Sequence, residues 1–464
     1  MLLAASALAK PNILLILVDD MGYGDMGFTG SEVLQTPNLD ALAASGVFFR
    51  QGYVTSPVCS PSRAGLVTGR DPRRFGYEGN LNQPAPDYAT RPELLGLAPG
   101  EHTVADHLKA AGYATGLIGK WHLGVTAPFH PNVRGFDYFC GHLSGSHTYF
   151  PREDYNNIER NGEPVTDFSS EYLTTFLTDD ALRFIDGVED GKPWFLFLSY
   201  NAPHTPMEAT DEDLAVYAHI EDRGRRTYAA MMHSLDVNVG RVIDHLAESE
   251  MREDTLVVFL SDNGGATNNS SWNGELSGAK GTLREGGVRV PFFVSWPGGL
   301  PAGQTFEKPV SALDLLPTFL AAAGAEPLTL REPMSHEDAR NFNRGVNRYG
   351  AYDGVNLVPV LRGEEPLPER SLFWRLQGQA AVMQGADKLI SLSHRPAQLF
   401  RPGEDPGERH DRAAEDPETL HALFEELGRW QALLPTVPLF GSSPYWKGES
   451  AKIYDNWDPK EEPR

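Results

Sequence analysis

Long hydrophobic runs, cysteines and basic residues are all scarce in this chain of 464 residues. No apolar run approaches the roughly 18 residues that a membrane-spanning helix needs. The only two cysteines, Cys59 and Cys140, cannot form a disulfide framework. Lys and Arg number 40 against 63 Asp and Glu, and the net charge of −23 repels the phosphate backbone of nucleic acids. These shortages exclude a transmembrane protein, a disulfide-rich scaffold and a basic nucleic-acid binder.

What the chain does have is an alternation of apolar runs with helix-like stretches. Hydrophobic residues make up 41 % of it, enough for a large core. Strands are predicted at residues 13–18, 114–118, 194–199, 256–260 and 290–296, and helices at 37–45, 104–111, 229–246 and 310–323. This alternation predicts an α/β fold in which helices flank a mostly parallel central sheet.

The pattern changes after residue 325. Residues 325–350 are polar and charged without a clear period, as in a linker or a surface insertion. Shorter strands at 371–375, 380–383 and 388–391, followed by a helix near 417–434, predict a smaller α+β unit with an antiparallel sheet. We therefore expect a large domain at 10–350 and a C-terminal subdomain at 351–464.

The first nine residues, MLLAASALA, are apolar and small, and an Ala-x-Ala pattern ends just before Lys10. This pattern is typical of the end of a secretory signal peptide, although the basic segment that opens one is missing. The alternative is a ragged terminus or a late start codon. We expect residues 1–9 to be a signal-peptide remnant and the protein to be periplasmic or secreted.

Polar clusters follow four of the predicted strands directly. They comprise residues 19–20, 119–122, 201–204 and 262–265. In open α/β sheets ligands bind in the crevice at the carboxyl ends of the strands, so these clusters are expected to meet in one cleft.

The clusters divide into two kinds of chemistry. The first group offers only oxygen ligands and comprises Asp19, Asp20, Asp262 and Asn263. Carboxylates that converge repel one another unless a cation neutralises them, and oxygen ligands favour Ca²⁺ or Mg²⁺ over zinc. The second group is basic and comprises Arg63, Lys120, His122, His204 and Lys280. An acidic protein that gathers positive charge in one pocket is expected to bind a small anion there.

Cys59 precedes Ser60-Pro61 and an apolar-periodic stretch, which predicts a helix N-terminus right behind it. Such an N-terminus stabilises an anion at this position. From these residues alone, Cys59 is either a thiolate nucleophile or a buried structural cysteine.

Two stretches carry a family resemblance. Cys59-Ser-Pro-Ser-Arg63, followed by Thr68-Gly-Arg70, resembles the Cys-x-Pro-x-Arg signature of formylglycine-dependent sulfatases. Gly119-Lys-Trp-His-Leu-Gly124 resembles the second signature of that family. Asp19-Asp20, His204, Asp262-Asn263 and Lys280 follow in the family's order, and Asp405-Pro-Gly-Glu408 is typical of its C-terminal part. The resemblance runs from Pro11 to about Trp430 and implies an alkaline-phosphatase-like architecture with a catalytic domain at 10–350.

The resemblance also implies a mechanism. A maturation enzyme would oxidise Cys59 to formylglycine (3-oxoalanine), and a hydroxyl of the aldehyde hydrate, polarised by Ca²⁺, would attack the sulfur of a sulfate ester. Residue 59 would bind this Ca²⁺ together with Asp19, Asp20, Asp262 and Asn263, and Asp262 could also accept the hydroxyl proton. The other implied roles are holding the hydrate (Arg63), neutralising the sulfuryl oxygens (Lys120 and Lys280), protonating the leaving alcohol (His204) and deprotonating the second hydroxyl (His122).

The alcohol part of the substrate is expected to contact loops near the cleft rim. The candidate residues are Arg70, Arg73, Asn80, His142, His147 and Arg289. The basic Arg70-Asp-Pro-Arg-Arg74 stretch in an acidic protein favours a sulfated carbohydrate as the substrate. The alternatives are a phosphoester or phosphonate monoester hydrolase with the same nucleophile, and a sulfated-glycan binder without catalysis.

Overall fold

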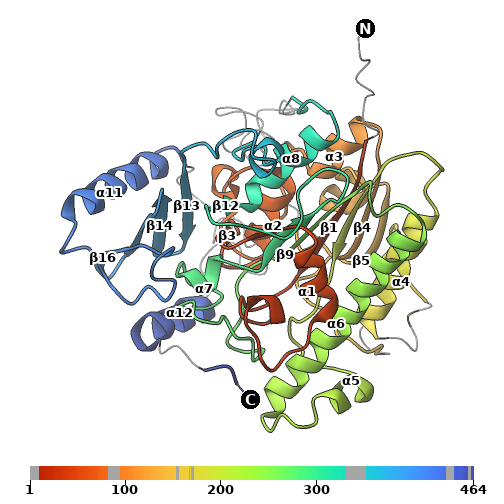
Figure 1. Ribbon diagram of the computed structural model, residues 1–464, viewed down its shortest axis with the longest axis horizontal. Coiled ribbons are helices and arrows are strands. Elements are labelled where there is room, and N and C mark those ends of the chain that lie inside the picture. The colour runs from red at the N-terminus through yellow and green to blue at the C-terminus, as the bar shows by residue number, and fades with distance from the viewer. Residues whose placement is uncertain are drawn as a thin grey trace.

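The computed structural model describes residues 10–81, 95–152, 156–166, 168, 172–329, 352–434, 444–457 and 461–463. The strands of its large sheet are β1 (Asn12–Val18), β2 (Val47–Phe49), β4 (Ala114–Lys120), β5 (Tyr138–His142), β6 (Glu159–Arg160), β7 (Glu163–Pro164), β8 (Trp194–Ser199), β9 (Thr255–Ser261), β10 (Phe292–Ser295) and β11 (Gln304–Phe306). They lie in the order β11-β2-β10-β9-β1-β8-β4-β5-β6-β7. Figure 1 labels β9, β1, β4 and β5 of this sheet. The five neighbours β9, β1, β8, β4 and β5 run parallel, which confirms the predicted mostly parallel sheet.

Helices cover both faces of the large sheet. One layer comprises α1 (Pro37–Ala44), α4 (Leu173–Asp186) and α6 (Arg223–Glu248), and the other comprises α2 (Cys59–Thr68), α3 (Val104–Ala110) and α8 (Leu315–Ala322). The position of β1 in the centre of the sheet explains why its sequence is continuously apolar. Its residues 13, 15 and 17 pack with the layer of α2, and residues 14, 16 and 18 with the layer of α6. A strand that is buried on both faces needs apolar side chains at every position.

A separate antiparallel sheet lies beside the large one. Its strands are β13 (Ser371–Leu376), β14 (Gln379–Gln384), β15 (Asp387–Leu392) and β16 (Arg395–Phe400), joined in that order. Helix α11 (Pro417–Gln431) packs on it through Leu423 and Leu427, while α12 (Pro444–Asn456) lies at its other side (Figure 1). The three predicted strands and the helix are confirmed. Strand β16 and helix α12 were not predicted, nor was α4.

The helix predicted at 310–323 is wrong in its first part. Residues Val310–Ser311 form strand β12, which pairs with β3 (Gly52–Tyr53), and Ala312–Asp314 form a 3₁₀ turn before α8 begins. Ser311 and Asp314 form a capping box, so the chain starts its helical turns only after Ser311. The apolar spacing predicted a longer helix because β12 and α8 pack into the same hydrophobic core.

Two predicted segments, residues 1–9 and most of 325–350, lie outside the described residues. Among the described residues, the remaining short α-helices are α5 (Asp211–Val216), α7 (Glu285–Val288) and α10 (Val358–Leu361). Within the described part of the chain, no helix has the length and apolar character needed to cross a bilayer.

Candidate active site

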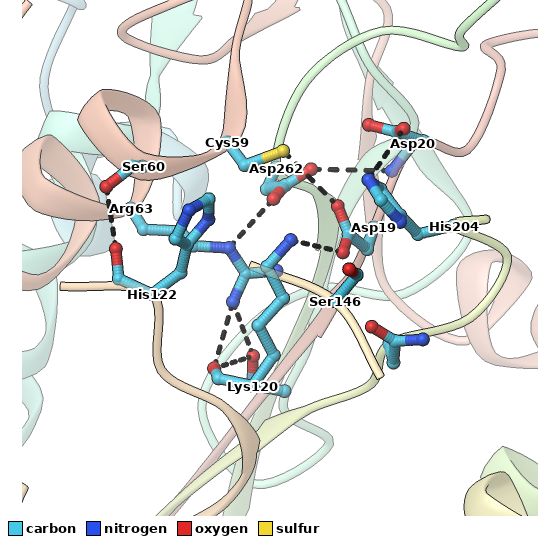
Figure 2. Close-up of polar contacts among 12 residues, drawn as sticks. Asp19, Asp20, Cys59, Ser60, Arg63, Lys120, His122, Ser146, His204 and Asp262 are labelled. Atoms are coloured by element: carbon cyan, nitrogen blue, oxygen red, sulfur yellow. Dashed lines mark hydrogen bonds and ion pairs between the residues drawn. The ribbon is translucent and has the colours of Figure 1, made fainter. Parts of the chain in front are cut away.

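The carboxyl ends of four adjacent parallel strands bring the polar clusters together. Asp19 and Asp20 follow β1, Lys120 ends β4, His204 follows β8, and Asp262 follows β9. Except for His204, which is partly buried, these side chains are buried, and they gather in the close-up of Figure 2. The predicted convergence of the polar clusters at the strand ends is therefore confirmed.

Cys59 is the first residue of α2, so the N-terminus of that helix faces its side chain. The Sγ atom lies 3.6 Å from Asp19 Oδ1 and 3.1 Å from Lys280 Nζ. Burial raises the pKa of the thiol to about 12, although Lys120 and Lys280 act in the opposite direction. An unmodified Cys59 is therefore a thiol near neutral pH, which disfavours the thiolate nucleophile left open by the sequence.

Acidic and basic side chains alternate in the site. Lys120 Nζ lies 2.5 Å from Asp19 Oδ2, and Lys280 Nζ lies 2.5 Å from Asp20 Oδ1. The third pair joins Arg63 Nε to Asp262 Oδ2 at 2.8 Å. The basic group of the sequence analysis is thus not a separate pocket, because each of its three permanent cations is paired with a carboxylate of the acidic group.

The oxygen atoms of the site fit a hard divalent cation. Among the described residues, Asn263 Oδ1 is buried and has no hydrogen-bond partner, while its Nδ2 donates to Asp20 Oδ1 at 2.7 Å. The amide is therefore held with its oxygen unpaired beside the carboxylates. One donor atom each of Asp19, Asp20, Cys59 and His204 lies within 4.8 Å of the others. Carboxylate and amide oxygens are the ligands that Ca²⁺ prefers.

The carboxylates of Asp20 and Asp262 differ in their proton affinity. Burial disfavours the charged form of Asp20, but Lys280 and His204 outweigh it and hold its pKa at about 2. Burial and the neighbouring charge of Asp19 raise the pKa of Asp262 to about 6, despite Arg63. Asp262 is therefore the better suited of the two to exchange a proton near neutral pH.

Two histidines flank this centre. His204 Nε2 lies 3.6 Å from Asp20 Oδ2, and His204 Nδ1 contacts the Thr205 carbonyl at 2.6 Å. His122 has φ +60°, and its carbonyl accepts a hydrogen bond from Ser60 Oγ at 2.6 Å. Burial lowers the pKa of both rings, to about 4 for His204 and well below the ordinary value for His122. A Cβ on Gly145 would come within 2.7 Å of His122 Nε2, so this glycine leaves room for the ring.

Ser199, the last residue of β8, is a site residue that the sequence analysis missed. Arg63 Nη1 donates to Ser199 Oγ at 2.7 Å and to the Lys120 carbonyl at 3.0 Å, and Ser199 Oγ donates to the same carbonyl at 2.8 Å. These bonds fix the guanidinium that holds Asp262. The position of Ser199, two residues before the polar cluster 201–204, was the available signal.

Comparisons with known proteins agree with this geometry. Residues 11–325 match the family model described as Sulfatase. The chain is 37 % identical over 383 residues to N-acetylgalactosamine-6-sulfatase of Sus scrofa, covering 78 % of this chain and 68 % of the relative. It is 32 % identical to arylsulfatase A of Homo sapiens, covering 97 % of this chain and 94 % of the relative. The chain belongs to the sulfatase family. It is a sulfuric ester hydrolase with an alkaline-phosphatase-like fold.

Solved structures share the fold of this chain. The structure of Ps i-CgsB in complex with k-i-k-neocarrahexaose superposes with a TM-score of 0.82 at 35 % identity, covering 96 % of this chain and 97 % of that one. A phosphonate monoester hydrolase of Agrobacterium radiobacter superposes with a TM-score of 0.59 at 20 % identity, over 91 % of this chain and 95 % of that one. The second likeness shows a shared fold alone.

Three arginines predicted to contact substrate at the rim of this sulfatase are instead buried and paired. Arg70 contacts Glu101 at 2.6 Å. Arg73 contacts Asp71 at 2.6 Å and lies over the Trp430 ring at 5.2 Å. Arg289 lies 3.5 Å from Glu285 and over the ring of Tyr23. Their guanidinium groups already have partners inside the fold, which favours a structural role for these residues over contact with substrate.

The other three substrate candidates lie nearer the reactive centre. Asn80 Oδ1 accepts a hydrogen bond from Ser60 N at 3.0 Å, so Asn80 binds the helix N-terminus beside Cys59. His142 ends β5 in register with Lys120 and is buried. Its ring centroid lies 5.5 Å from that of His147, which is also buried. Contact of these three residues with substrate stays a prediction.

Proposed function

We propose that this sulfatase removes sulfate from a sulfated carbohydrate, with residue 59 converted to formylglycine by a maturation enzyme and with Ca²⁺ as its metal. The observation that carries the proposal is the position of Cys59. It begins α2, lies 3.1 Å from Lys280 Nζ and 3.6 Å from Asp19 Oδ1, and adjoins three buried ion pairs. A nucleophile at this position would meet both a cation and the carboxylates that hold a metal.

The cation would be held by Asp19, Asp20, Asp262, Asn263 and residue 59. Bound there, Ca²⁺ supplies a Lewis acid beside residue 59. Three carboxylates and three basic side chains balance one another in the site, so a divalent ion would leave an excess of positive charge. That excess favours binding of an anionic sulfate ester.

Conversion of Cys59 supplies a hydroxyl nucleophile where the buried thiol supplies none, because the hydrate of an aldehyde carries two hydroxyl groups. Asp262 would accept the proton of the attacking hydroxyl, as its raised pKa of about 6 allows. Arg63 would orient that carboxylate through its bond of 2.8 Å to Oδ2.

The remaining roles belong to the lysines and histidines. Lys120 and Lys280 would turn from their carboxylate partners to the sulfuryl oxygens and stabilise the charge that develops there. His204 would donate a proton to the oxygen of the leaving alcohol, because a sugar alkoxide is a poor leaving group. Its pKa of about 4 would have to rise for this role, and the negative charge of a bound sulfate ester acts in that direction. His122 would take the proton of the second hydroxyl, which releases sulfate and restores the aldehyde.

The substrate class rests on the relatives. Those named N-acetylgalactosamine-6-sulfatase cover most of this chain, and Ps i-CgsB was solved with a carbohydrate bound. We assign the catalytic domain to residues 10–350 and the smaller subdomain to 351–464. Export to the periplasm or the medium stays a prediction from residues 1–9.

A substrate panel tests the proposal. Sulfated mono- and oligosaccharides are assayed for free sulfate beside matched aryl sulfate, aryl phosphate and phosphonate esters. We expect release from at least one sulfated saccharide and faster turnover of the aryl sulfate than of the aryl phosphate. Faster phosphate or phosphonate turnover would favour the phosphoester alternative. A binder without catalysis would be favoured if the wild type shows no turnover and Cys59→Ala keeps the saccharide affinity of the wild type.

A further inference from the structure

The residue after Lys280 is held by the C-terminal sheet. Gly281 N donates to the Pro57 carbonyl at 2.9 Å, two residues before Cys59. The Gly281 carbonyl accepts a hydrogen bond from Gln379 Nε2 at 2.8 Å. With φ +87°, Gly281 adopts a backbone conformation that favours glycine. One peptide segment thus joins the approach to residue 59, the catalytic-site lysine and strand β14.

Gln379 is the first residue of β14, and its side chain is bonded at both ends. Its Oε1 accepts from Tyr454 Oη at 2.7 Å and from Leu283 N at 3.3 Å. The amide oxygen therefore faces two donors, and the amide nitrogen faces the carbonyl of Gly281. This pattern assigns the orientation of the amide.

A second anchor lies four residues further along the same segment. Lys388 Nζ of β15 lies 2.7 Å from Glu285 Oε1 and 3.0 Å from Glu408 Oε1, and all three side chains are fully buried. Glu285 N donates to Glu408 Oε2 at 3.0 Å. Glu408 ends the Asp405-Pro-Gly-Glu408 stretch, to which the proposed mechanism assigns no role. Figure 1 shows α7, which begins at Glu285, between this sheet and the end of β9.

We propose that Gln379 is a positioning residue for Lys280. It fixes the Gly281 carbonyl, and with it the backbone from which Lys280 reaches into the active site. The inference rests on the role of Lys280 under the proposed function. Lys280 is held on its other side by a hydrogen bond from its own N to the Gly265 carbonyl at 3.0 Å. Together with the bond from Gly281 N to the Pro57 carbonyl, three hydrogen bonds hold this backbone, and loss of the Gln379 contact removes one of them.

A shift of the ammonium group matters because Lys280 Nζ is bonded tightly, at 2.5 Å from Asp20 Oδ1 and 3.1 Å from Cys59 Sγ. Misplacement of a catalytic group by about 1 Å can lower a rate by about 100-fold. Gln379→Leu removes the donor to Gly281 without adding charge. We expect kcat on an aryl sulfate to fall about tenfold and KM to change less than threefold.

The matched control is Leu427→Ala. Leu427 packs on the opposite face of the same sheet, in the cluster of Val382 and Leu389, and has no role near Lys280. Both variants are compared with wild type in kcat, KM and Tm, at a temperature where all three are folded and at equal formylglycine content. Leu427→Ala is expected to lose at least as much Tm as Gln379→Leu while keeping kcat within twofold of wild type.

Two results would overturn the positioning role. One is a kcat within twofold of wild type in Gln379→Leu. The other is a fall in kcat that is in the same proportion to the fall in Tm in Gln379→Leu and in Leu427→Ala. If Gln379→Leu does not fold, Gln379→Met, which keeps the length of the side chain, is measured against the same expectations. A wild type that carries formylglycine and releases no sulfate would instead refute the proposed function.

Discussion

Lys280 Nζ lies 3.1 Å from Cys59 Sγ, although the two residues are 221 positions apart in the chain. The contact places a buried ammonium group beside the atom that would become the nucleophile. Asp20 and the other carboxylates raise the pKa of Lys280 against the effect of burial, so the group is charged near neutral pH. The site therefore has a charged ammonium group where negative charge would develop.

Replacement of Lys280 by alanine tests the importance of this cation. We expect kcat/KM on sulfate esters to fall by about 100- to 1000-fold, as for loss of one electrostatic donor in other enzymes. Lys192→Ala, at an exposed position, serves as the control and is expected to stay within twofold of wild type. A Lys280→Ala enzyme with near wild-type kcat/KM would contradict the assigned role.

Metal removal tests the oxygen site through stability as well as activity. Protein stripped with a chelator is expected to lose activity and Tm, and added Ca²⁺ is expected to restore both. At about 100 times its Kd, a bound ion stabilises the fold by about 2.7 kcal/mol. In Asn263→Ala the rise in Tm should need at least about tenfold more Ca²⁺, whereas the exposed neighbour Asn268→Ala should respond like wild type. An equal response of both variants would exclude Asn263 as a ligand.

The positions of the principal site residues were predictable because they follow apolar runs directly. Asp19-Asp20 and Asp262-Asn263 come after strands that pair in parallel, so neighbouring strand ends had to bring them together. The pairing of each lysine with one carboxylate could not be predicted, since it depends on side-chain reach across four loops. The contact of Gln379 with the active-site backbone could not be predicted for a similar reason, because its partner Gly281 lies 98 positions away.

The sequence did not reveal that an arginine among the substrate candidates has a buried acidic partner. Arg70 and Glu101 lie 31 positions apart, and no periodicity links them. In Arg70→Met the Glu101 carboxylate stays buried without its cation, so the free energy of unfolding should fall by about 3–5 kcal/mol.

Chemical denaturation measures this loss, and kinetics on the remaining folded enzyme should show little change in KM. The double variant Arg70→Met/Glu101→Leu is expected to recover most of the stability, because no unpaired charge remains. A large rise in KM without loss of stability would return Arg70 to the substrate-binding residues.

His107 predicts a pH dependence of stability away from the active site. Burial, and then the neighbouring His102, lower the pKa of His107 to about 4, and its Nδ1 accepts a hydrogen bond from Leu328 N at 3.0 Å. The unfolded chain, with a pKa near 6.5, binds the proton more tightly than the folded protein. The contribution of His107 is therefore complete above about pH 6.5 and is lost as the pH falls through about 4.

The loss amounts to about 3 kcal/mol if the group titrates alone. Urea unfolding of wild type and His107→Gln between pH 7.5 and pH 4 measures it, because the difference between the two should shrink as the pH falls. His410→Gln, at an exposed position, controls for the effect of the substitution itself. A difference that stays constant with pH would contradict the effect of burial on this ring.

The most direct test is the mass of the peptide that contains residue 59, determined on protein made in a host with the maturation enzyme and assayed in parallel for sulfate release. We expect the aldehyde or its hydrate in place of the thiol, with turnover proportional to the converted fraction and absent from Cys59→Ala. An intact thiol in protein that hydrolyses sulfate esters at full rate would contradict it.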